Sequence, residues 1–225
     1  MDAAAKIVLS CDLIDSVWTQ VDDLANSLIK LTEMATQNND FGDLKSAGKL
    51  YKSYQHSKSG WLTSAYQLSF PLMEKKRRKS VATAWVNYQI SICGSGIAPY
   101  ADQEKSRKNA GPMLHVSFWL TQLDFTEAGM FVEFPARWEE QATDSQRLIY
   151  WDVDRPTERK QWTFSVRLLE MQNEEVLRRS VIEPISRLLR GEATSIALPE
   201  TTVGLVFYAE EDRGDGMKTP VAIER

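Results

Sequence analysis

Asp152 and Asp154 are the pair of carboxylates in this sequence best spaced to hold a divalent cation. Residues two apart on a strand point to the same face, and carboxylates on one face can hold Mg²⁺ against phosphate oxygens during phosphoryl transfer. Glu133 or Glu170 could complete such a set if the fold brought it near. The pair also stands where a predicted strand enters a turn, a place where Asp is common, and we favour this second interpretation. We therefore expect no metal site, no cofactor and no assigned catalytic residue.

A run of five cations, Lys75, Lys76, Arg77, Arg78 and Lys79, stands between two predicted strands. Like charges repel one another, so the stability of the fold does not require this run. At a phosphate backbone each side chain would displace counterions and add affinity that falls with salt. A second group follows in the next long polar segment: Lys105, Arg107 and Lys108. These eight residues are the predicted macromolecular contact site, and the alternative is a solvated tip that protects a sheet edge from aggregation.

The known motifs for phosphate binding and hydrolysis are absent. The run Cys93-Gly94-Ser95-Gly96 follows a predicted strand, but it lacks the spacing of the P-loop, and Pro99 occupies the place of the third glycine in G-x-G-x-x-G. It is also not the G-x-S-x-G turn of hydrolases. With two His and two Cys in the chain, a zinc site rich in these ligands cannot be built within one copy.

The composition is that of an ordinary globular protein: 225 residues, 43% hydrophobic and 26% charged,. A net charge of −4 excludes a global attraction to nucleic acid or to an anionic membrane, so any such contact must be local. There is no apolar run of about 18 residues and no start typical of a secretory signal, so we expect no membrane contact and a reducing, cytoplasmic location.

Residues 1–36 have the clearest helical pattern. Apolar residues recur there every seven positions, and most positions three places later are also apolar, as on an amphipathic helix. The repeat consists of Ile7, Ile14, Val21, Leu28 and Ala35, followed by Ser10, Val17, Leu24 and Leu31. This stripe either covers a face of the protein's own sheet or pairs with a helix of a partner chain. We expect Ile14, Val21, Leu28 and Leu31 to be buried.

Residues 61–168 alternate apolar and polar side chains with the period of two that is typical of half-buried strands. The longest example is a hairpin over 61–93, and the runs 114–120, 130–134 and 162–168 repeat the pattern. Residues 147–153 form a further strand pattern that is apolar on both faces, and a turn over 154–160 joins it to the run 162–168. Residues 45–55 are compatible with a short helix. The strand segments within 61–168 together predict an antiparallel, meander-like sheet.

Residues 170–190 predict a second helix that Pro184 should kink or split and that Gly191 should end, and residues 202–224 predict a terminal hairpin. The order of elements predicts one α+β domain over 1–225, with a mainly antiparallel sheet covered by the long N-terminal helix and a C-terminal helix.

The functional prediction is a non-enzymatic, adaptor-type protein that binds another macromolecule. Protein is the favoured partner, either a different protein or a second copy in a homo-oligomer, and the contact candidates are the N-terminal helix, exposed tryptophans and the basic run 75–79. The alternative is a nucleic-acid-binding or metal-dependent nucleic-acid-processing protein that uses 75–79 and the carboxylates Asp152 and Asp154.

Overall fold

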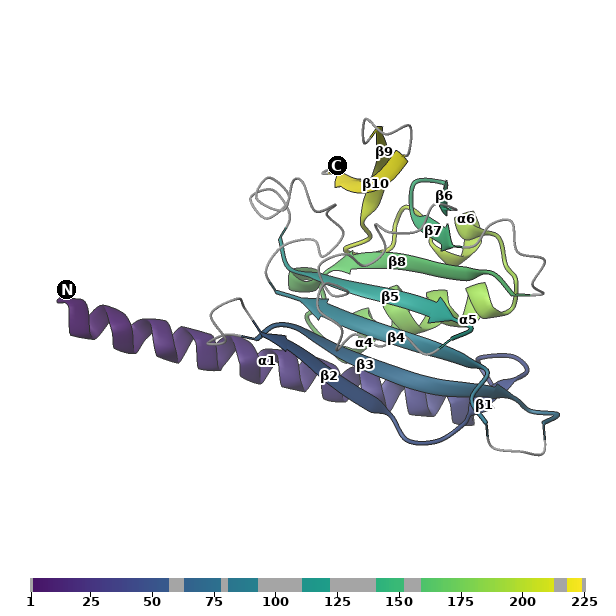
Figure 1. Ribbon diagram of the computed structural model, residues 1–225, viewed down its shortest axis with the longest axis horizontal. Helices are drawn as coiled ribbons and strands as arrows, with labels where there is room; N and C mark the ends of the chain where they lie inside the picture. Colours follow the sequence, from purple (N-terminus) through teal and green to yellow (C-terminus); the bar gives the residue numbers. More distant parts are fainter. Residues whose placement is uncertain are drawn as a thin grey trace.

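An eight-stranded antiparallel sheet forms the centre of the protein, with helices on one face (Figure 1). The structure is a computed structural model that describes residues 2–56, 63–77, 81–92, 111–121, 141–151, 159–212 and 218–223. The strands of the sheet are, in chain order, β1 (Leu44–Ser46), β2 (Tyr51–His56), β3 (Thr63–Glu74), β4 (Ala84–Ser91), β5 (Met113–Trp119), β6 (Gln141–Asp144), β7 (Leu148–Trp151) and β8 (Gln161–Arg167). The predicted α+β class with an antiparallel sheet is confirmed.

The spatial order of the strands is β1-β3-β4-β5-β8-β7-β6, with β2 also paired to β3. Strands β3 to β5 form a meander, and β6 to β8 form a second meander that returns to pair with β5. β1 and β2 share the outer edge of β3, β1 along Leu72–Glu74 and β2 along Thr63–Ser69. The short helix predicted over 45–55 is therefore wrong. The long edge of β3 offers hydrogen-bond partners to this segment, and Tyr54 stacks on Tyr66 with ring centroids 4.6 Å apart,.

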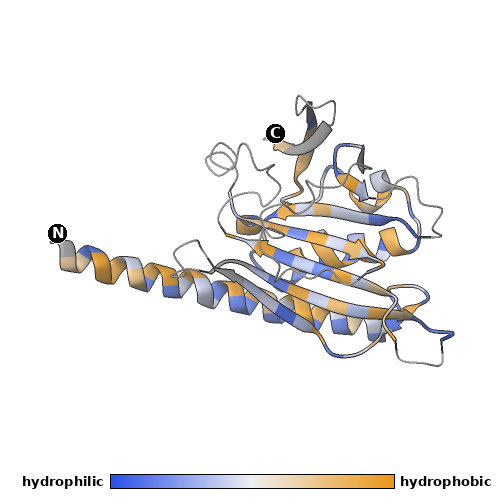
Figure 2. Cartoon of the chain, in the orientation of Figure 1, coloured by the Kyte–Doolittle hydropathy of each residue, from blue (hydrophilic) through white to orange (hydrophobic). Residues whose placement is uncertain are grey.

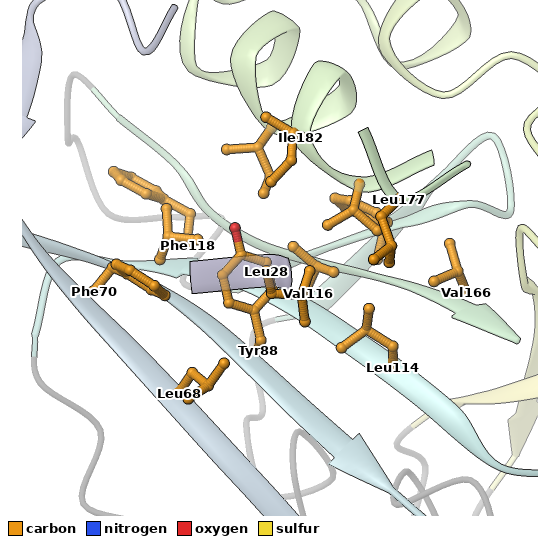
Figure 3. Close-up of a cluster of buried hydrophobic side chains, with 14 of the residues drawn as sticks. Leu28, Leu68, Phe70, Tyr88, Leu114, Val116, Phe118, Val166, Leu177 and Ile182 are labelled. Atoms are coloured by element: carbon orange, nitrogen blue, oxygen red, sulfur yellow. The ribbon is translucent and has the colours of Figure 1, made fainter. Parts of the chain in front are cut away.

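Helix α1 (Ala3–Gln37) runs under the sheet and extends beyond it (Figure 1). The side chain of Asp2 caps its first turn by accepting a hydrogen bond from the Ala5 N–H at 2.7 Å,. Thirty-five residues make a helix about 50 Å long, so it is longer than the face it can cover. Its second half forms part of the core, where Leu28 belongs to the same buried cluster as Tyr88 and Val116 (Figure 3).

The C-terminal helical layer packs on the same face as α1. It consists of α4 (Glu174–Leu177), the π-helical turn η3 (Arg178–Ile182) and α5 (Glu183–Leu189). Pro184 cannot donate a backbone hydrogen bond, and in a regular α-helix its ring would clash with the carbonyl four residues earlier. The wider π-helical turn η3, which precedes Pro184, relieves this clash,. Gly191 ends the helix with φ +78°,. The helix predicted over 170–190 is thus present from 174 to 189, but Pro184 does not split it: the chain continues through the π-helical turn into α5.

Both faces of the central strands are buried, and this differs from the half-buried strands predicted. One face carries the apolar core beneath the helices, including Leu68, Phe70 and Val166 (Figure 3). The opposite face is polar: Asn87 and His115 are each 1% exposed. Alternation in a sequence reports which residues share a face, but it does not report whether the polar face meets water.

The chain ends in a separate two-stranded sheet, β9 (Phe207–Asp212) paired antiparallel with β10 (Lys218–Ile223). The terminal hairpin is therefore confirmed. The Val206 N–H donates to the Ser165 carbonyl at 2.9 Å, which ties the start of this segment to β8. Short helical turns, η2 (Leu168–Glu170) and α6 (Thr194–Ala197), join the larger elements. None of the helices in the described part of the chain has the length and apolarity of a membrane span.

Candidate functional site

Three of the four candidate metal-binding carboxylates, Asp152, Asp154 and Glu133, lie outside the described residues. Glu170 ends η2 and is exposed. Among the residues that the structure describes, no group of three or more His, Cys, Asp or Glu side chains could hold a metal ion. The metal-dependent alternative therefore receives no support from the described part of the fold.

The basic run is described only as far as Arg77. Lys75, Lys76 and Arg77 are exposed, as predicted for a solvated tip. The Lys75 ammonium donates to the Gly42 carbonyl at 2.5 Å, and the Glu74 carboxylate lies 3.4 Å from Lys76 and 3.8 Å from Arg77. The other predicted contact residues lie outside the described part of the chain: Arg78, Lys79, Lys105, Arg107 and Lys108.

An ion pair beside this tip joins Asp43 to Arg159. The Arg159 guanidinium donates to both oxygens of the Asp43 carboxylate, one of them at 2.6 Å, and this hydrogen bonding is the main cause that lowers the pKa of Asp43. The backbone N–H of Lys75 donates to the Asp43 carbonyl at 2.8 Å. Lys76, Arg77 and Arg159 thus each have a carboxylate as a neighbour, which reduces the positive charge that phosphates would meet here.

The first half of α1 exposes a run of large apolar side chains. Ile7, Leu9 and Leu13 are 64%, 54% and 66% exposed, and this half extends past the edge of the sheet (Figure 2). Ile14 is also exposed, so its predicted burial is wrong, because the helix is longer than the face it covers. The predicted burial of the other three residues of the stripe is confirmed for Val21, Leu28 and Leu31.

The acidic residues of α1 lie away from this stripe. Between residues 6 and 21, no acidic side chain occurs at the positions of the seven-residue repeat that begins at Ile7. None occurs at the positions directly beside the repeat on the helix surface either. The acids fall on the back of the helix: Asp12, Asp15, Asp22 and Asp23. A second helix packed along the stripe would therefore meet no carboxylate from this one, as in coiled-coil seams.

An open groove of about 620 Å³ begins where the exposed half of α1 ends. One wall is the middle of α1, with Val17 and Leu24. The other wall comes from η2 and the start of α4, where Leu169 is 74% exposed. Asp23 and Glu174 are among the polar residues of the lining. The apolar surface of α1 and the apolar surface of the groove are thus continuous at Val17.

Only one part of this candidate site, the apolar stripe of α1, could be recognised in the sequence. The seven-residue repeat allowed either core packing or pairing with a partner, and the structure assigns core packing to residues 21–35 and leaves residues 7–14 exposed. The groove was missed because its walls come from segments far apart in the chain, 17–27 and 168–177, and no local pattern joins them.

Comparison with protein-family models, curated proteins and solved structures gave no match to this chain. What the protein does must therefore be inferred from its own surfaces.

Proposed function

We propose that this protein is a non-enzymatic interaction protein that associates with a second copy of itself through the first half of α1. The observation that supports this proposal is the exposed apolar stripe at Ile7 and Ile14, which continues the repeat of the buried stripe at Val21 and Leu28. Exposed apolar patches rimmed by polar residues are typical of protein contact surfaces. We place the protein in the cytoplasm, where the exposed free thiol of Cys11 stays reduced.

A second copy fits because the chain carries both halves of a self-complementary interface, as a two-fold dimer requires. Consider two α1 helices that cross antiparallel with Ile14 of one beside Val17 of the other. Ile7 then lies beside Leu24 of the other copy, at the wall of its groove. Each exposed half-helix would enter the groove of the other subunit, and both apolar surfaces would be covered at once.

The charge of the half-helix argues against a lipid or a nucleic acid as its partner. Between residues 2 and 23 the helix carries Lys6 as its single cation and five aspartates. Helices that lie in a membrane interface are usually rich in Lys and Arg on the polar face, and phosphates would be repelled by the acidic back.

The first test is the mass of the protein in solution, measured by sedimentation over a range of concentration. The unaltered chain should be a dimer, and Ile7→Glu with Ile14→Glu should be a monomer with an unchanged unfolding midpoint. The matched control is Ser16→Glu with Thr19→Glu, which adds the same two charges on the back of the helix and should leave the dimer intact. The proposal is wrong if the unaltered chain stays monomeric up to about 100 µM, the range of association weaker than about −5.5 kcal/mol.

A cross-linking test checks the antiparallel direction, in a chain with Cys11→Ser and Cys93→Ser. Ile7→Cys combined with Leu24→Cys should form a disulfide between copies, because the antiparallel pair brings these positions together. Ile7→Cys alone should not, because the two copies of position 7 would then lie about 25 Å apart along the axis, beyond the reach of a disulfide. A disulfide formed by Ile7→Cys alone would indicate a parallel pair instead.

A further inference from the structure

The sheet face opposite α1 is buried and yet lined with polar side chains. Two rows of directly paired residues cross the four central strands on this face. The first row consists of Gln67, Gln89, His115 and Ser165, and the second of Ser69, Asn87, Ser117 and Thr163. All eight residues are 4% exposed or less. No side chain in the two rows is an acid, a lysine or an arginine.

One end of this face carries a hydrogen-bond chain through Tyr208, Ser165 and His115. The Tyr208 hydroxyl donates to Ser165 Oγ at 2.5 Å, and burial raises the pKa of Tyr208, so the phenol keeps its proton,. Ser165 Oγ also lies 2.6 Å from His115 Nδ1, so the same hydroxyl joins Tyr208 to the imidazole. These residues are held rigidly and fix the geometry of the first row.

The middle of the face is different, because polar atoms there lack hydrogen-bond partners among the described residues. They are both amide atoms of Asn87, Oε1 of Gln67 and Nε1 of Trp85. Asn87 lies opposite Ser69 and Ser117, diagonal to Gln67 and two residues from Trp85, so the four atoms belong to one contiguous area. A buried polar group without a partner is destabilising, and native proteins rarely keep several together.

Tryptophans border this area on the side away from Gln67. Trp85 pairs across the strands with Trp119, and Trp119 stacks on Trp151 with ring centroids 6.1 Å apart and 17° between planes. The Trp151 indole N–H donates to Thr163 Oγ1 at 3.0 Å, which holds that ring in place. The area therefore places indole rings beside an amide that offers a donor and an acceptor side by side,.

We propose that this face binds an uncharged planar heterocycle whose edge carries a hydrogen-bond donor next to an acceptor, as the edge of a nucleobase does. Asn87 would pair with that edge through both of its amide atoms. Gln67 Oε1 would accept one further hydrogen bond and the Trp85 indole N–H would donate another. The indole rings would stack on the plane of the ligand. Enclosure of the ligand is normal for small-molecule sites. The absence of charge from the two polar rows favours the base over a phosphate-bearing ligand. This site is separate from the dimer contact proposed above.

The test measures the unfolding midpoint and tryptophan fluorescence in the presence of adenosine, guanosine, cytidine or uridine. Glucose and inorganic phosphate are the comparison compounds that should not bind. At least one nucleoside should raise the midpoint in a saturable manner, while glucose and phosphate should not. If no nucleoside acts at millimolar concentration, or if glucose or phosphate acts in their place, the proposal is wrong.

The variant that tests the role of Asn87 is Asn87→Leu, with Asn26→Leu on the exposed back of α1 as its matched control. Asn87→Leu should leave the midpoint unchanged or raise it, because an unpaired amide is removed, and it should weaken nucleoside binding about tenfold or more. Asn26→Leu should bind normally. A large fall in the midpoint that Asn87→Ala also shows would mean that Asn87 is structural, and unchanged binding by Asn87→Leu would equally overturn the assignment.

Discussion

The hydroxyl of Thr32 on α1 lies 2.7 Å from the hydroxyl of Tyr88 at the centre of the sheet. Thr32 uses its own hydrogen in a bond of 2.7 Å to the Leu28 carbonyl, so Tyr88 must be the donor and Thr32 the acceptor. Burial raises the pKa of Tyr88, which keeps its phenol protonated in this role. This bond is a polar link between α1 and strand β4 of the sheet.

The direction of this bond predicts that its two partners respond differently to substitution. Tyr88→Phe leaves Thr32 bonded to Leu28, so the free energy of unfolding should fall by only about 0.5–1.5 kcal/mol. Thr32→Val leaves the Tyr88 hydroxyl buried without an acceptor and should cost about 1–3 kcal/mol. The double variant should cost less than the sum of the two single variants. Denaturant unfolding of all four proteins checks the cycle, and a larger cost for Tyr88→Phe than for Thr32→Val would show that the donor is assigned wrongly.

The two halves of α1 should differ sharply in their effect on stability. Leu28 is 0% exposed and Ile14 is 37% exposed, so Leu28→Ala should cost about 2–5 kcal/mol, whereas Ile14→Ala should change stability by no more than about 0.5 kcal/mol in the monomer. Unfolding measured at low protein concentration checks both values. If Ile14→Ala lowers stability only at high concentration, the loss reports on association between copies.

The features predicted well are those that depend on residues close together in the sequence. The seven-residue repeat predicts α1, and Pro184 indicates where the C-terminal helix departs from regular α-helical geometry, because both act within a few turns of one helix. The strands β1 and β2 were missed because their conformation is decided by the free edge of β3 and not by a local period. The polar site was missed for the same kind of reason: His115 and Ser165 meet at 2.6 Å although they are 50 residues apart.

The ion pair between Asp43 and Arg159 should make a pH-dependent contribution to stability. Hydrogen bonding to Arg159 lowers the pKa of Asp43 below its ordinary value of 3.8. The folded state therefore binds this proton less tightly than the unfolded state, so the contribution is present above pH 3.8 and is lost as the pH falls through the lower, folded value. Because Asp43 is largely exposed, solvent screens the pair, and we expect no more than about 1 kcal/mol.

Asp43→Asn tests this contribution. The variant should be less stable than the unaltered chain near pH 7, and the difference should shrink as the pH falls below about 4. High salt at pH 7 should reduce the same difference, since ions screen exposed charges. A difference in unfolding free energy that is constant from pH 7 to pH 3 would contradict the role assigned to the ion pair.

The basic tip gives the last prediction. Replacing Lys76, Arg77 and Arg78 with Ser should leave folding nearly intact, because surface changes away from caps and cores usually shift stability by about 0.5 kcal/mol or less. The described part supports this expectation, since Lys76 is 81% exposed in its side chain and its carboxylate neighbour, Glu74, lies 3.4 Å away. Binding is a separate matter, because three cations in one small patch would attract a phosphate backbone or an acidic protein.

The test compares the unaltered chain with the triple variant in binding to duplex DNA, to RNA and to an acidic peptide, each over a series of salt concentrations. If the tip is a contact site, the triple variant should bind at least one of them more weakly, and its dependence on salt should be shallower because fewer counterions are released. The matched control is Lys45→Ser with Lys49→Ser and Lys52→Ser, which removes the same charge from the β1–β2 edge and should have a smaller effect. Unchanged affinity and an unchanged salt slope in the triple variant would show that Lys76, Arg77 and Arg78 are not a contact site and only keep the tip soluble and protect the sheet edge.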